Sequence, residues 1–109
     1  MKMILAIINK RDAGAVINEL IQKGYYVTKL STSGGFLREG NTTVLIGVEE
    51  DKISGAIEII KNLSHSRQEV VSPAVIGEYD TSFLTNNNIM VTVGGATVFV
   101  LGVEAHEKF

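Results

Sequence analysis

The residues best suited to binding chemistry stand in one short glycine-rich stretch. The consecutive Gly34 and Gly35 let backbone N–H groups converge on an anion, and the guanidinium of Arg38 can hold a phosphate through two parallel hydrogen bonds. Phe36 is an apolar ring that a turn does not require, and such a ring can stack on a nucleotide base. Asn41 adds an amide able to bond a base edge. The spacing matches neither the P-loop nor the dinucleotide fingerprint, so a plain hairpin turn stays open as the alternative.

The sequence carries no pattern typical of catalysis or metal binding. It contains no cysteine, which excludes disulfides, thiolate ligands and cysteine nucleophiles. Its two histidines, His65 and His106, lie far apart and have no second ligand at metal-site spacing. No serine stands in a Gly-x-Ser-x-Gly elbow. Helix capping and solubility explain the acidic residues at expected helix starts, Asp12 among them. We therefore expect a protein that is not an enzyme and holds no metal.

The composition is that of an ordinary globular domain. The chain has 109 residues, 45% of them hydrophobic and 20% charged, with a net charge of −2. This length predicts one domain over residues 1–109. The charge offers no basic surplus for a nucleic-acid backbone. The longest apolar run, residues 3–8, is far too short for a bilayer span and opens no signal-peptide pattern. We expect no membrane insertion and a cytoplasmic location.

Hydrophobic periodicity predicts the elements that position the glycine-rich stretch. A buried strand at residues 3–8 leads into a helix capped by Asn9, whose apolar stripe includes Ile21, and a second helix begins near residues 50–51. Further strands are predicted at residues 25–32, 43–48, 70–71, 89–93 and 97–101, and residues 74–88 form a long mobile loop. Without that loop and its flanking strands, the order is βαββαβ. This order predicts an α+β, ferredoxin-like sandwich, with an antiparallel sheet, two helices on one face and an enlarged loop before the last strand.

Two stretches of the sequence resemble a known family. Residues 28–43, TKLSTSGGFLREGNTT, are similar to the TKLATTGGFLRxGNTT signature of the PII-like cyclic di-AMP receptor proteins. Residues 93–103, VGGATVFVLGV, resemble the VGGATVFVLPV segment of the same family. Together with the first residues and the closing Phe109, the similarity spans the whole chain. The resemblance implies a signal-transduction receptor, a homotrimer that binds cyclic di-AMP in the clefts between subunits and relays the signal by loop rearrangement.

The resemblance also implies a set of ligand contacts. The matching positions expected beside cyclic di-AMP are Thr28, Gly35, Phe36, Leu37, Arg38, Asn41, Gly47 and Phe99. Tyr26 and Lys108 complete the expected site, although the family commonly has an arginine at the first position and a glutamine or histidine at the second. The glycine-rich loop and residues 66–93 are expected to respond to the ligand, with residues 70–71 and 90–91 pairing as a ribbon. No cofactor is implied besides the ligand, and the sequence names no downstream protein target.

A second class of function stays open from the sequence. Residues 93–103 also resemble the GDGKIFVLPV segment of the PII nitrogen sensors. The alternative is therefore a PII-type regulatory protein that binds ATP or ADP, or that acts mainly by docking on a partner protein. An enzyme acting on the nucleotide would need an acid–base pair or a metal cluster, and the sequence offers neither.

Overall fold

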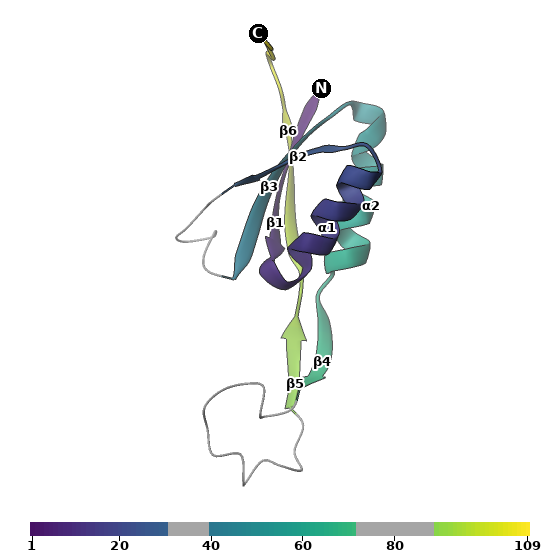
Figure 1. Cartoon of the computed structure of the whole chain (residues 1–109), viewed down its shortest axis with the longest axis vertical. Coiled ribbons are helices and arrows are strands. Elements are labelled where there is room, and N and C mark those ends of the chain that lie inside the picture. The colour runs from purple at the N-terminus through teal and green to yellow at the C-terminus, as the bar shows by residue number, and fades with distance from the viewer. Residues whose placement is uncertain (31–39, 72–88) are drawn as a thin grey trace.

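The part of the chain that the structure describes folds into two helices, a short 3-10 turn and six strands (Figure 1). The computed structural model describes residues 1–30, 40–71 and 89–109. The glycine-rich residues 34–39 and the loop predicted at residues 74–88 therefore lie outside the described residues. In chain order the elements are β1 (Lys2–Asn9), α1 (Lys10–Gln22), β2 (Tyr26–Leu30), β3 (Asn41–Val48), η2 (Glu50–Lys52), α2 (Ile53–Ser64), β4 (Arg67–Val71), β5 (Ile89–Val93) and β6 (Ala96–Gly102).

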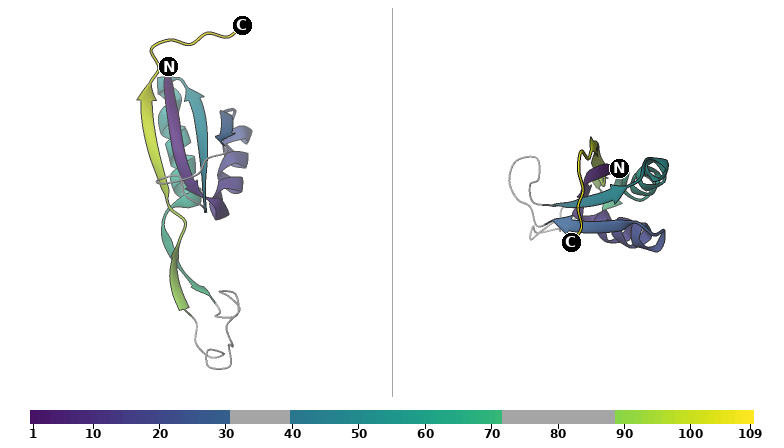
Figure 2. Two further views of the ribbon diagram at one scale, coloured as in Figure 1. Left: turned by 90° about the vertical axis from the view of Figure 1, so that its left-hand side faces the viewer. Right: turned by 90° about the horizontal axis from the view of Figure 1, so that it is seen from above.

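Four strands form one antiparallel sheet in the order β2-β3-β1-β6. Both helices lie on the same side of this sheet, as the view from above shows (Figure 2). The first strand is central because it pairs with β3 along one edge and with β6 along the other. This arrangement confirms the predicted ferredoxin-like βαββαβ sandwich.

The hydrophobic core fills the space between the sheet and the helices. Side chains alternate between the two faces of a strand, so every second residue of β1 and β3 points toward the helices. Each fully buried isoleucine in this layer contributes roughly 1.5–3 kcal/mol to folding. The buried core residues are Ile4, Ala6, Ile8, Ala13, Val16, Leu20, Val44, Ile46, Val48, Ala56 and Ile60.

The start of α1 is set by the predicted cap. The side-chain oxygen of Asn9 accepts a hydrogen bond from the backbone N–H of Arg11 at 3.0 Å. This bond satisfies one of the free donors at a helix start. The predicted apolar stripe was wrong at Ile21, which is 56% exposed. The buried face of α1 instead runs through Asp12, Ala13, Val16 and Leu20.

The second helix begins later than predicted. Glu50–Lys52 form a 3-10 turn, and α2 starts at Ile53. The hydroxyl of Tyr25 donates a hydrogen bond to the carbonyl of Lys52 at 2.9 Å and so ties this turn to the entry of β2. Gly55 leaves room for that hydroxyl, because a Cβ atom at Gly55 would lie 2.5 Å from the Tyr25 oxygen. Gly55 lowers the helix propensity of α2, but it makes room for the Tyr25 hydroxyl to pack against the helix.

The strands β4 and β5 form a separate two-stranded ribbon, which leads away from the sheet (Figures 1 and 2). Val70 pairs with Met90, which confirms the pairing that the family resemblance implied. At its inner end the ribbon connects directly to α2 and β6. Neither of the helices that the described ranges contain has the length and apolar character needed to cross a bilayer.

Candidate ligand site

The face of the sheet turned away from the helices carries the candidate residues. We call it the open face. Residues paired across two strands lie on the same face of the sheet, and Ile46, Val27 and Val98 all pack toward the helices. The residues directly before and after each of them in its own strand therefore point to the open face. Five residues expected at the site occupy open-face positions on three strands, namely Tyr26, Thr28, Asn41, Gly47 and Phe99.

Tyr26, Thr28 and Gly47 form one group at the β2 edge of the sheet. Tyr26 is directly opposite Gly47, and Thr28 is two positions farther along the same strand. The Tyr26 side chain is 86% exposed. Both Tyr26 and Gly47 line a pocket of about 280 Å³ that also includes Lys52. An exposed ring beside a glycine backbone offers a flat apolar surface, in a pocket lined by the acidic Glu49 as well as by Lys52.

Phe99 lies at the opposite edge of the sheet, on β6. Its partner is Leu5 on the central strand, and it is 44% exposed. Thr28 on β2 is three strand spacings away, or about 14 Å. Lys108 lies beyond β6 and is exposed. One subunit therefore does not bring Phe99 together with the group at the β2 edge.

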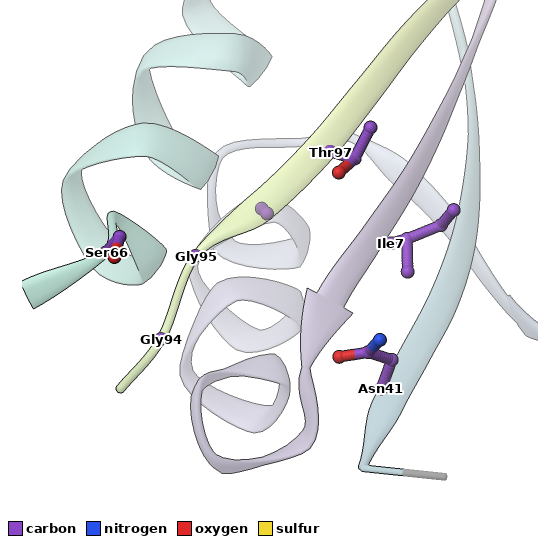
Figure 3. Close-up of a pocket in the computed structure, with 7 residues that line it drawn as sticks. Ile7, Asn41, Ser66, Gly94, Gly95 and Thr97 are labelled. Carbon is purple, nitrogen blue, oxygen red and sulfur yellow. The ribbon is translucent and has the colours of Figure 1, made fainter. Parts of the chain in front are cut away.

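Asn41 begins β3 and lies at the other end of that strand from Gly47, about 20 Å away at the rise of a β-strand. It lines an open pocket of about 400 Å³ with a largely polar wall (Figure 3). The pocket combines an amide, two hydroxyls and the backbone of two glycines. Its lining residues are Ile7, Asn41, Ser66, Gly94, Gly95, Ala96 and Thr97.

The pocket has an ion pair next to it that the sequence did not reveal. Asp12, which we expected to serve helix capping and solubility, is only 7% exposed and pairs with Arg67 of β4. The hydrogen bonds to Asp12 raise the pKa of Arg67 above its ordinary value. A signal was present in the spacing: Asp12 is four residues before Val16 and eight before Leu20, on the buried face. A carboxylate there requires a cationic partner.

Four of the residues expected at the site are Gly35, Phe36, Leu37 and Arg38, and these lie outside the described residues. Both histidines are exposed; His65 follows α2, where a ring nitrogen is 3.2 Å from the carbonyl of Lys61, and His106 lies beyond β6. Among residues 1–30, 40–71 and 89–109, no three potential ligand side chains gather into a metal site.

Comparisons with known proteins concern the chain as a whole. A family model described as "Cyclic-di-AMP receptor" matches residues 1–109. Among solved structures, the crystal structure of a functionally unknown protein from Pediococcus pentosaceus superposes with a TM-score of 0.79. The two sequences are 42% identical, and the match covers 99% of this chain and 96% of the other.

Proposed function

The chain belongs to the cyclic-di-AMP receptor family, and on that premise we propose that it is a non-enzymatic receptor for cyclic di-AMP. The proposed assembly is a homotrimer with one ligand site in each cleft between neighbouring subunits. Binding would rearrange the glycine-rich loop and the segment that includes the β4–β5 ribbon. This change would carry the signal to a protein target in the cytoplasm.

The observation that carries the proposal is the division of the candidate residues between the two edges of the sheet. Tyr26, Thr28 and Gly47 lie at the β2 edge, whereas Phe99 lies on β6 at the other. A neighbouring copy whose β6 approaches the β2 edge would bring both groups to one ligand. Such a contact joins two different surfaces, and repeating it closes into a ring. A ring of three supplies three equivalent sites.

The residues of the proposed site suit the parts of a cyclic dinucleotide. Arg38 would hold a phosphate through two charged hydrogen bonds. Phe36 and Phe99 would stack on or beside the adenine rings. The amide of Asn41, in the polar pocket, matches the donor and acceptor on an adenine edge. Tyr26, in place of the usual arginine, would contribute ring contact rather than charge.

The test of ligand identity is calorimetric titration of the purified protein with cyclic di-AMP, cyclic di-GMP, ATP and ADP. We expect saturable binding of cyclic di-AMP at one ligand per subunit. The other three nucleotides should bind at least about tenfold more weakly, because cyclic di-GMP presents different base edges and ATP and ADP lack the second adenine. Tenfold corresponds to about 1.4 kcal/mol, within the range of about 1–3 kcal/mol for one good base contact. Tighter binding of ATP or ADP would favour the PII-type alternative, and absence of cyclic di-AMP binding would reject the proposal.

The relay is tested by amide hydrogen exchange with and without saturating cyclic di-AMP. A ligand can shift a conformational equilibrium only as far as it prefers one state. We expect slower exchange in residues 67–93, the ribbon and the segment it carries. The amides of α1 serve as the reference, since the core holds that helix. Unchanged exchange in residues 67–93 would leave the receptor without a relay.

A further inference from the structure

Asp12 of α1 and Arg67 of β4 are joined by two parallel hydrogen bonds. Arg67 Nη1 donates to Asp12 Oδ2 at 3.2 Å, and Nη2 donates to Oδ1 at 3.0 Å. Arg67 Nη1 also donates to the backbone carbonyl of His65 at 3.3 Å. A planar guanidinium that meets a carboxylate in this way fixes the angle as well as the distance between them. The ion pair therefore sets where the ribbon leaves the body of the protein.

This ion pair packs directly against Gly94, at the junction between β5 and β6. A Cβ atom at Gly94 would overlap Arg67 Nη1 and would lie 2.9 Å from Asp12 Oδ2. Gly94 also has a φ of +77°, a conformation that favours glycine. The backbone at this junction is thus shaped around the paired side chains.

The neighbouring Gly95 is held by backbone hydrogen bonds on both sides. Its N–H donates to the carbonyl of Ser64 at the end of α2, and its carbonyl accepts from the N–H of Asn9 at 3.3 Å. In the first turn of α1, the N–H of Lys10 donates to the carbonyl of Gly40 at 2.7 Å. Residues 9–12 therefore connect to the junction at Gly94 and Gly95 and also to the chain just before Asn41.

Those two connections reach opposite sides of the polar pocket. Ser66, Gly94 and Gly95 lie on one side in Figure 3, and Asn41 lies on the other. Neither Asp12 nor Arg67 lines the pocket itself. The side of the pocket that packs directly on the ion pair is the wall formed by Ser66, Gly94 and Gly95, which we call the glycine wall.

We propose that Asp12 and Arg67 are positioning residues for nucleotide binding, which hold the glycine wall at a fixed place opposite Asn41. This inference rests on the proposed function and adds to it two residues outside the ligand's reach. The same ion pair anchors β4, so the position of the ribbon and the affinity of the pocket are thermodynamically linked.

A second ion pair supplies a matched control. Arg11 Nη2 lies 2.7 Å from Glu69 Oε2, so this pair also joins the first turn of α1 to β4. The Arg11 side chain is 53% exposed, and neither Arg11 nor Glu69 lines the polar pocket. Exposed ion pairs of this kind contribute little. The other carboxylate oxygen of Glu69 lies 3.5 Å from Arg67 Nε, so Glu69 bridges the two arginines. Arg11→Met removes the same charge and one link between α1 and β4, but it leaves the contacts of Arg67 with Asp12 and Glu69 in place.

The first measurement is the affinity of the full-length variants for cyclic di-AMP. Coupling through residues that do not touch the ligand typically changes affinity between about twofold and thirtyfold. We expect a loss in that range for Arg67→Met and for Asp12→Asn, and none for Arg11→Met. Arg67→Lys keeps the positive charge without the planar fork, so it should recover only part of the affinity. Wild-type affinity in a folded Arg67→Met protein would overturn the inference.

The second measurement needs no ligand. Amide exchange at Gly95, followed by NMR in the free protein, should be faster in Arg67→Met than in the wild type and unchanged in Arg11→Met. The amide of Ile4, in the central strand, reports whether the whole fold has been weakened. If the wild type fails to bind cyclic di-AMP, the proposed function is rejected together with the nucleotide part of this inference, and the Gly95 amide still decides whether the ion pair holds the glycine wall. Wild-type exchange there in Arg67→Met would overturn it.

Discussion

Thr28 and Phe99 stand at the two ends of one row of residues across the open face. Thr28 pairs with Leu45, Leu45 with Leu5, and Leu5 with Phe99. The row is about 14 Å long at the spacing of β-strands. A ligand that touched both ends within one subunit would have to lie across the two leucines. A ligand between two subunits needs only one end of the row from each.

The first prediction concerns the assembly. Light scattering at micromolar concentration should give a mass of about 35 kDa, three times the 11.8 kDa of one chain. A site shared between unlike surfaces can repeat around a closed ring, and the proposed ring has three subunits. A stable monomer of about 12 kDa would contradict the shared site.

Subunit mixing tests the same prediction at the level of residues. Thr28→Ala and Phe99→Ala trimers should each bind cyclic di-AMP weakly. When the two are unfolded, mixed and refolded together, some clefts receive both native residues, so part of the wild-type binding should return. Each variant unfolded and refolded by itself in the same way is the control. If the mixture binds no better than either variant, the two residues do not share a cleft.

The second prediction concerns the glycine-rich loop. Hydrogen bonds to a charged group contribute about 1.5–3 kcal/mol, so Arg38→Ala should weaken cyclic di-AMP binding roughly ten- to a hundredfold. Phe36→Ala should cost about 1–3 kcal/mol of binding free energy if the ring stacks on a base. Arg11→Ala removes an arginine outside the proposed site and should leave the titration unchanged. A loop that only turns the chain predicts equal affinity for all three variants and the wild type.

The third prediction compares two glycines by their free energy of unfolding in urea. Gly94→Ala should destabilise the protein by about 1–3 kcal/mol, because its positive φ is strained for other residues and its Cβ would overlap Arg67. Gly14 lies in α1, where a Cβ would meet no atom within 4 Å. Gly14→Ala should therefore stabilise by about 0.4–1 kcal/mol. A gain in stability for both changes would show that the Gly94 backbone adapts.

The fourth prediction is a double-mutant cycle at Gly55 and Tyr25. Gly55→Ala should lower the free energy of unfolding in the wild type, since the new Cβ would lie 2.5 Å from the Tyr25 hydroxyl oxygen. In a Tyr25→Phe background the nearest ring carbon is 3.8 Å away, an ordinary contact. There the same change should gain about 1 kcal/mol of helix propensity. Additive effects would show that the hydroxyl does not explain the glycine.

The elements of this fold were largely predictable because each has a strong local pattern. The apolar run before Asn9 and the helical spacing of Val16 and Leu20 identify β1 and α1 without any knowledge of the rest of the chain. The start of α2 was placed too early because Glu50 and Asp51 look like a helical first turn but form a 3-10 turn.

The arrangement of the site was less accessible, since it depends on pairing between distant segments. The residues around Thr28 do not predict that Phe99 lies in the same row, because that depends on the register in which β1 pairs with β6. The partner of Asp12 lies 55 residues along the chain, in a strand of five residues. The ligand contacts came from the family signature, and those at residues 35–38 stay predictions.

The central place of β1 has a consequence for how the protein is made. Lys2 pairs with Gly102, so during synthesis β1 finds its second neighbour only after β6 has been made, 100 residues further along the chain. Until β6 is available, β1 presents a row of free backbone groups to any other extended segment. Contacts this distant in sequence also slow folding, because the chain must close its longest loop before they form. Chaperone binding during that interval would protect the unfinished edge from pairing with another copy.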